Sequence, residues 1–454
     1  MEHPPPALPF YPLANPKGEE HSCEVCSKPA YLQCGVCRIT YYCGIEHQKI
    51  DWVGIHKKIC LDLITFRESK GFVSKDKREK KNEELQNKNI YLVRLTQLEA
   101  QKLLFKGKSE EALPAALQYL RFAVRAYGIA CVELVSPYLV LAESCIGLGK
   151  LNQAETYLAQ AQWIVLKAQH ECSNNIQSQL HRKLGLLYAA KGNYKLALAS
   201  LAKDIFYASL EYGTDHIRTA GGYFQMAEVF HAMYKDDGNK GSLDQDFTEK
   251  STEFVYLSVT PEIPEIIKQN KSYGPLIYER ETKSNDSFST NPDFCIQPPS
   301  SKAKVVDNLY SRVVNIWARY LKELVESLLF KPVSSEDIGA IMVETTQEAK
   351  QTLDDAQKAE AEKMLYAIEK YHNQRINGNE SNAITCNSAK PDPKVQLYLT
   401  LSMLNYILER KQESIQYLIK AKVAAEFMVE HPKITVNINL MERALSEKKI
   451  QQVA

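Results

Sequence analysis

The chain lacks the sequence features that mark several common functional classes. No apolar run reaches the roughly 18 residues of a membrane-spanning helix, and the first residues form no basic-then-apolar secretory signal. The net charge is only +1, which argues against bulk electrostatic binding to DNA or RNA. There is no Gly-rich phosphate loop and no nucleophile elbow. We therefore expect an intracellular protein without a membrane span, a nucleic-acid partner or a catalytic site.

Cysteine is concentrated in one short stretch, where six of the eleven cysteines lie between Cys23 and Cys60. Two Cys-x2-Cys pairs are followed by Cys-x3-His and His-x3-Cys, which supplies eight soft ligands, enough for two tetrahedral zinc ions. In each of the last two pairs the ligands are four residues apart, so they share one face of a helix. Disulfides are the alternative, but the other cysteines are scattered and no secretory signal precedes them.

The same stretch resembles the MYND zinc finger, whose pattern is Cys-x2-Cys, Cys-x2-Cys, Tyr-Cys-x3-Cys-Gln, Trp and His-x3-Cys. The resemblance implies two cross-braced zinc sites. One site would take Cys23, Cys26, Cys43 and His47, and the other would take Cys34, Cys37, His56 and Cys60. His47 stands where the family usually has cysteine, and the interval from Trp52 to His56 is one residue longer than usual.

The resemblance also implies a small peptide site on the finger, of the kind that takes short motifs containing proline and leucine. Gln48 and Trp52 would line it, because they are four residues apart on the family's helix and face the same way. Trp52 could equally be a core residue that steadies a small module. A glutamine has less reason to be buried there, so Gln48 favours the functional interpretation.

The segments on either side of this finger (21–62) differ in composition. Residues 1–20 carry six prolines and read as a disordered lead, although they could be a ligand for a proline-binding groove. Residues 63–88 read as a charged helical linker, in which lysines and glutamates are interleaved. A basic nucleic-acid contact is conceivable there, but a solvated helix is favoured because the acidic residues cancel most of the charge.

Residues 89–235 repeat with a period of 42 to 43 residues, the spacing between the turn glycines Gly107, Gly149 and Gly192. Each turn has a small residue seven positions before the glycine and an alanine five positions after it. These residues are Ala100, Ala142 and Gly185, followed by Ala112, Ala154 and Ala197. Small residues at both points let two antiparallel helices approach closely, as in tetratricopeptide repeats of a longer variant.

The second half of the chain resumes this pattern after an interruption. We expect a disordered insertion at 236–304, helices that continue the array at 305–375, a loop at 376–393, and a terminal repeat with a capping helix at 394–454. The helix through Ala227 lacks a neighbour in sequence, so we predict that the helix from Val305 covers it and that the insertion is an excursion from one turn. The alternative is that the insertion packs as a small domain of its own.

The predicted fold is mainly α: a double-zinc finger followed by an α-solenoid of tetratricopeptide-like hairpins, whose concave groove would hold a partner helix or peptide. The function that follows is a non-enzymatic interaction adaptor. The order of parts resembles MYND proteins of the ciliary or sperm-flagellar axoneme, which implies another tetratricopeptide-repeat protein and axonemal components as partners. A nuclear co-repressor adaptor is the alternative. A MYND lysine methyltransferase is less favoured, because His372-Asn373 and His431-Pro432 are isolated and have no strand context.

Overall fold

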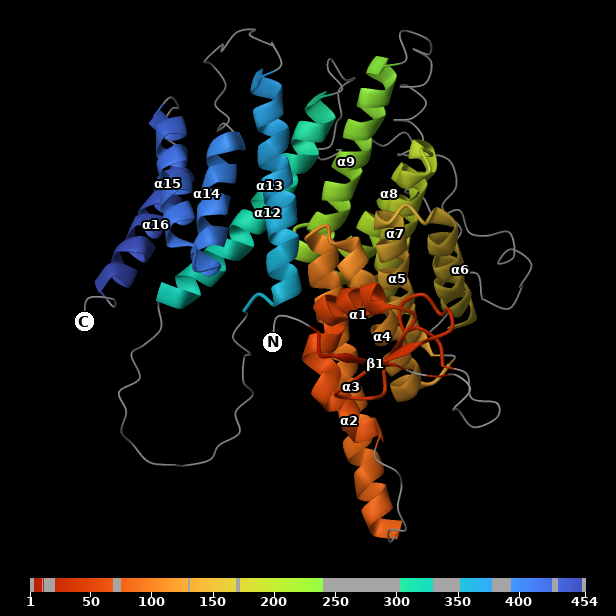
Figure 1. Cartoon of the computed structure of the whole chain (residues 1–454). Helices are drawn as coiled ribbons and strands as arrows, with labels where there is room; N and C mark the ends of the chain where they lie inside the picture. The colour runs from red at the N-terminus through yellow and green to blue at the C-terminus, as the bar shows by residue number, and fades with distance from the viewer. Residues whose placement is uncertain are drawn as a thin grey trace, which may run out of the picture.

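The computed structural model describes residues 4–9, 11, 21–67, 75–129, 131–168, 172–239, 303–329, 352–377, 393–426 and 432–450. These residues form a small zinc-finger region followed by a solenoid-like arrangement of helices, as the sequence predicts (Figure 1). Most of the expected insertion at 236–304 and of the loop at 376–393 lies outside the described residues.

The finger combines a small antiparallel sheet with a run of short helices. The strands are β1 (Ala7–Pro9), β2 (Leu32–Cys34) and β3 (Tyr41–Tyr42), with β2 in the middle. They are followed by α1 (Ile45–Asp51), the π-helical turn η2 (Trp52–His56) and α2 (Lys57–Arg67). The presence of β1 corrects the expectation of a disordered lead: residues 7–9 form the outer strand of this sheet.

Three consecutive helical hairpins form the first part of the array. They consist of α3 (Lys75–Phe105), α4 (Ser109–Tyr127), the short 3-10 turn η3 (Val132–Leu134), α5 (Val135–Gly147), α6 (Leu151–Ala168), α7 (Asn174–Ala190) and α8 (Tyr194–Tyr212). The turn glycines have φ angles between 71° and 75°, a conformation that residues with a Cβ rarely adopt. All six predicted small residues are buried. At Gly185 a methyl group would lie 2.7 Å from Leu201 Cγ, so this pair of helices needs glycine there.

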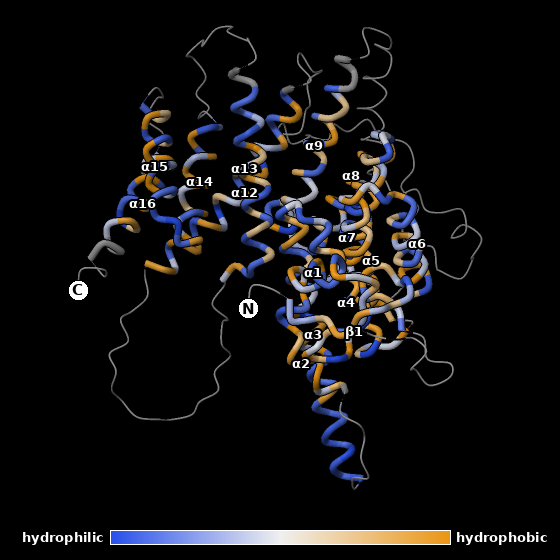
Figure 2. The backbone as a smooth tube through the Cα atoms, in the orientation of Figure 1, coloured by the Kyte–Doolittle hydropathy of each residue, from blue (hydrophilic) through white to orange (hydrophobic). Residues whose placement is uncertain are grey.

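The charged segment at 63–88 is not a separate linker. The helix α2 ends at Arg67, and α3 begins at Lys75 and continues without interruption to Phe105 in the first hairpin. The first turns of α3 are exposed and project from the body as a hydrophilic rod (Figures 1 and 2). The solvated-helix interpretation therefore fits, but the boundary expected at residue 88 falls inside one helix.

The fourth hairpin joins two helices that are far apart in sequence. The helix α9 (Ile217–Asn239) packs along α12 (Ala303–Leu329). Val306, Tyr310 and Val313 are all buried, as expected for residues at the positions of the small and large packing residues in the earlier repeats. The prediction that the helix from Val305 covers the helix through Ala227 is confirmed.

The last helices are α13 (Asp355–Asn377), α14 (Pro393–Ile407), α15 (Lys411–Glu426) and α16 (Pro432–Ile450). The pair α14 and α15 forms the terminal hairpin, in which the Ser402 and Ser414 hydroxyls each donate to the other residue's carbonyl at 2.8 Å. The helix α16 packs against both of these helices and against α12, in the capping position that the sequence indicates (Figure 1).

The helix α13 does not extend the stack but bridges its two ends. It packs on α3 and on α14, and Lys102 Nζ donates to Asp355 Oδ2 at 2.6 Å. Beside it a cleft of about 540 Å³ remains, with Glu143, Arg182, Lys183 and Glu360 in its lining. The concave groove expected for a partner helix is therefore partly filled by the chain's own α13.

Two apolar cores run through the molecule and meet near Tyr188. The first core extends from Cys23 in the finger to Leu187 in α7. The second core extends from Ala197 in α8 to Ala444 in α16. The finger thus shares a continuous core with the first two hairpins and with α7. This sharing fixes where the finger's ligands and its open surfaces lie relative to the helices.

Candidate metal centre

Two knuckles of the same shape position the Cys-x2-Cys pairs. In each, the residue after the second cysteine is left-handed, with φ of 58° at Ser27 and 54° at Arg38. Its amide donates to the carbonyl of the first cysteine at 3.0 Å, to Cys23 and Cys34 respectively. The closed turns aim both sulfurs of a pair at one point, as a shared metal requires.

The first cluster joins one knuckle to the start of α1. Cys23, Cys26, Cys43 and His47 bring their ligand atoms within 4.8 Å of one another. His47 Nδ1 lies 3.4 Å from Cys23 Sγ and 3.1 Å from Cys43 Sγ, while the Cys26 and Cys43 sulfurs are 3.6 Å apart. The histidine that replaces a family cysteine therefore presents its nitrogen at the same centre as the three sulfurs.

The second cluster joins the other knuckle to η2 and α2 and is fully buried. Cys34, Cys37, His56 and Cys60 again lie within 4.8 Å of one another at their ligand atoms. His56 Nε2 is 3.4 Å from Cys34 Sγ and 3.6 Å from Cys37 Sγ, and the Cys34 and Cys60 sulfurs are 3.9 Å apart. The two clusters interleave along the chain, which is the cross-braced order implied by the resemblance.

Both clusters fit zinc. A tetrahedral ion with Zn–S bonds of about 2.3 Å has sulfur–sulfur distances of about 3.8 Å. The Cys26–Cys43 and Cys34–Cys60 sulfur distances of 3.6 Å and 3.9 Å lie close to that value. Zinc binds thiolates, and in this cluster the hydrogen bond shared by Cys34 and Cys37 lowers the pKa of Cys37 and raises the pKa of Cys34. When bound, the two ions would supply structural cross-links that hold the knuckles to the helices.

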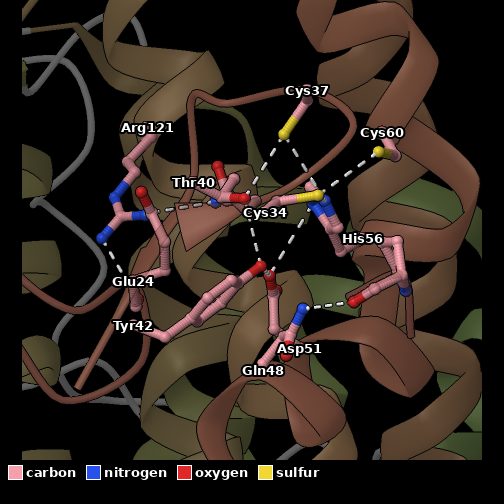
Figure 3. A network of polar contacts seen from close by, with 12 residues as sticks. Glu24, Cys34, Cys37, Thr40, Tyr42, Gln48, Asp51, His56, Cys60 and Arg121 are labelled. Carbon is pink, nitrogen blue, oxygen red and sulfur yellow. Dashed lines mark hydrogen bonds and ion pairs between the residues drawn. The ribbon is translucent and has the colours of Figure 1, made fainter. Parts of the chain in front are cut away.

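A ring of buried polar side chains surrounds the second cluster (Figure 3). The Tyr42 hydroxyl donates to Asp51 Oδ2 at 2.6 Å and lies 3.1 Å from Thr40 Oγ1. Asp51 Oδ2 is 3.8 Å from Nδ1 of His56, the nitrogen that does not face the sulfurs. At this distance the contact is electrostatic and not a hydrogen bond, and His56 Nδ1 has no hydrogen-bond partner among the described residues.

Burial raises the pKa of Asp51, and the nearby His56 and the Tyr42 hydroxyl oppose that shift. Sequence reasoning did not identify Thr40 or Asp51 as part of the centre. Neither has the spacing of a ligand, and only the folded path of the chain brings them to His56.

The π-helical turn η2 accommodates the extra residue between Trp52 and His56. A π turn holds one more residue than an α turn, so His56 still faces the cluster from a continuous helix. Gly54 lies in this turn, where a methyl group would be 2.4 Å from the carbonyl oxygen of Glu111. The turn therefore serves both the metal centre and the close approach of the finger to α4.

Further contacts dock the finger on α4. Arg121 forms an ion pair with the Glu24 carboxylate, and its Nη2 donates to the Glu24 carbonyl at 3.1 Å. Gln118 Nε2 donates to the same carboxylate at 3.2 Å. Because Glu24 lies inside the first knuckle, these contacts connect the zinc centre directly to the helical array (Figure 3).

Gln48 and Trp52, the predicted peptide contacts, are both nearly buried, at 3% and 6% exposure. Gln48 Nε2 donates to the carbonyl oxygen of Pro5 at 2.9 Å, so its partner is the chain's own lead. The Trp52 ring lies 5.7 Å from the His56 ring, and its indole nitrogen has no hydrogen-bond partner among the described residues. Their role in binding a partner's peptide stays a prediction.

These features define a structural, double-zinc, cross-braced finger attached to a helical array. Residues 23–60 match the protein-family model of the MYND finger. The finger is thus a MYND zinc finger followed by a helical region, and MYND domains mediate interactions between proteins. None of the described helices is both long and apolar enough to cross a membrane.

Proposed function

We propose that the chain is a non-enzymatic adaptor that joins protein partners through its MYND finger and through its helical array. The supporting observation is the shared core, which holds a peptide-recognition module in a fixed place on a helical scaffold. Among the described residues the sheet is limited to three short strands, and His372 lies on α13, away from any strand. A SET-type methyltransferase would need strands of its own beside a cofactor pocket.

The proposed surfaces differ in chemistry. On the finger, the β2 main chain and the Gln48 side chain contact main-chain groups of an extended segment, which suits short peptides containing proline and leucine. On the array, the cleft beside α13 has charges of both signs in its lining, so a polar, charged segment suits it better than an apolar helix. One chain could therefore hold two partners at once.

The setting that we propose is the ciliary or sperm-flagellar axoneme, with a second tetratricopeptide-repeat protein among the partners. The support is the order of parts, a MYND finger before long helical repeats, which resembles zinc finger MYND domain-containing protein 12. A nuclear co-repressor role is the alternative, favoured only by the basic residues around Lys77 and Arg78 on the exposed start of α3. Imaging the tagged chain in ciliated and non-ciliated cells distinguishes these two settings.

The adaptor proposal is tested by affinity purification with mass spectrometry of the tagged full chain from ciliated cells. We expect at least two classes of partner: one lost in Gln48→Ala, which removes the finger's side-chain donor, and one retained. Gln153→Ala, an exposed glutamine on α6, is the matched control and should lose neither class. Both variants should keep two zinc ions per chain.

Recovery of no specific partner by the wild-type chain would contradict the adaptor proposal. Transfer of a labelled methyl group from S-adenosylmethionine to a candidate lysine substrate would contradict its non-enzymatic character.

A further inference from the structure

Residues 4–9 occupy the edge of the finger sheet where an added peptide strand would bind. The strand β1 pairs antiparallel with β2, with Ala7 opposite Cys34 and Pro9 opposite Leu32. β3 pairs with the other edge of β2, so β1 takes the edge that the hairpin of β2 and β3 leaves open. The lead is therefore bound as peptides are bound in β-strand addition, through its main chain.

Side-chain contacts give this edge of the sheet a preference for certain residues in the bound strand. Pro5 is buried and its carbonyl accepts the Gln48 hydrogen bond, and Leu8 is half-buried beside Gly35. Pro6 and Pro9 are exposed. Prolines cannot donate a main-chain hydrogen bond, but an outermost strand does not need one on its solvent side. The edge thus selects a proline and, three residues later, an apolar side chain.

Gly35 is required for this contact. A methyl group on Gly35 would lie 2.6 Å from the Pro6 carbonyl oxygen, closer than such atoms approach. The φ of Gly35 is not in the left-handed region, so alanine fits the local backbone and only the bound strand would be excluded. This position separates recognition of the strand from binding of zinc by its neighbour Cys34.

The lead is attached to the finger by a short connection. Residues 10–20 separate Pro9 from the first described residue of the finger, so the lead is tethered by eleven residues. A tether of this length gives an effective concentration on the order of 1 mM, so the lead stays mostly bound if its Kd for the open edge is below that value. A partner's peptide must compete with that concentration.

We propose that residues 4–9 are an internal ligand that closes the finger's peptide edge, and that a partner's extended peptide of the same proline–leucine chemistry displaces them. The inference rests on the proposed adaptor function and adds that the finger of the isolated chain is already occupied. For a peptide with a Kd of about 0.1 mM at the open edge, competition by about 1 mM of tethered lead weakens the apparent affinity about tenfold.

The test uses a fluorescein-labelled peptide with the sequence of residues 3–10, titrated against the full-length chain and against a variant that lacks residues 1–9. We expect the truncated variant to bind the peptide about tenfold more tightly than the full-length chain. Gly35→Ala in the truncated background should abolish binding, while two zinc ions per chain and the helical circular dichroism are retained. A peptide with Pro5 and Leu8 both replaced by serine is the matched probe and should not bind.

Equal binding to both chains would overturn the proposal, because the lead would then not compete. Absence of binding to a truncated chain that keeps both zinc ions would overturn it as well. Loss of zinc on truncation would show that β1 is an integral part of the finger and not a ligand. In the full-length chain, Gly35→Ala should release the lead to protease cleavage with zinc retained; continued protection would count against the proposal. None of these outcomes concerns partners that bind the helical array, so they do not test the adaptor function. That function is contradicted only by the affinity purification described above.

Discussion

The shared core predicts that loss of the finger weakens the first helical hairpin. Cys34→Ser removes one ligand of the buried second cluster, and a finger of this size depends on its metals for stability. If the finger unfolds, α3 and α4 lose the surface that now covers them. Ile55 in η2 is 1% exposed, and the rings of Phe66 in α2 and Phe122 in α4 are 6.4 Å apart.

The magnitude follows from those contacts. Full burial of an isoleucine or phenylalanine side chain contributes about 1.5–3 kcal/mol, so Ile55 and Phe122, both fully buried at this contact, contribute about 3–6 kcal/mol together. The free energy of local opening of α3 and α4 should fall by that amount, which corresponds to about a 10²- to 10⁴-fold increase in the rate of amide hydrogen exchange. The helices from α8 onward pack in the second core and should change little.

Hydrogen–deuterium exchange with mass spectrometry, resolved by segment, is the assay. Cys131→Ser is the matched control, since this half-buried cysteine belongs to neither cluster. The control should leave the exchange of α3 and α4 within a few-fold of wild type. If Cys34→Ser releases the finger's amides while α3 and α4 keep wild-type protection, the finger and the array are independent and the reasoning is wrong.

Three further predictions concern the array. Asp204→Ala should lower the free energy of unfolding by about 3–5 kcal/mol in chemical denaturation, because it removes the buried carboxylate that accepts from Arg182 Nε at 2.7 Å and from the Ser178 hydroxyl at 2.6 Å. Glu155→Ala, which breaks the exposed ion pair with Lys191, should cost at most about 1 kcal/mol, and equal effects would refute the distinction. Burial lowers the pKa of His181 to about 4, below its ordinary 6.5. Between these two pH values the unfolded chain binds one more proton than the folded chain, so the free energy of unfolding falls as the pH drops from about 6.5 towards 4. His181→Phe should remove up to about 3 kcal/mol of that loss, and identical profiles of stability against pH for the variant and the wild type would contradict this. Replacement of residues 240–302 by a short turn should leave the melting temperature within a few degrees or raise it, whereas a large loss of helical signal would favour a packed domain there.

The sequence was sufficient for features whose residues carry a local pattern. Metal ligands can be predicted from their spacing in the sequence, because a knuckle and a helical turn each fix how many residues separate two ligands. The helical hairpins can be predicted from their repeated small residues, because close packing of two helices admits only small residues at positions such as Ala142 and Ala154. The pairing of α9 with α12 could be predicted because Val306 and Tyr310 repeat that pattern beyond the interruption.

Other features depend on contacts between distant segments and have no local pattern. Asp51 lies at His56 because α1 continues into a π turn, and an aspartate on a short helix is ordinary in sequence. The docking of β1 on β2 brings Pro5 to Gln48, 43 residues away, and proline-rich composition alone indicated disorder. The bridge made by α13 depends on contacts such as Lys102 with Asp355, 253 residues apart, which no periodicity could indicate.

The central claim is that a double-zinc finger is built into the helical body of an adaptor. Its most direct test is the zinc-to-protein ratio of the purified full-length chain by inductively coupled plasma mass spectrometry, combined with X-ray absorption at the zinc edge. The account predicts two zinc ions per chain, each with three sulfur ligands at about 2.3 Å and one nitrogen ligand at about 2.0 Å. One zinc ion per chain, or a shell of four sulfurs, would contradict the assignment of His47 and His56 and with it the cross-braced centre.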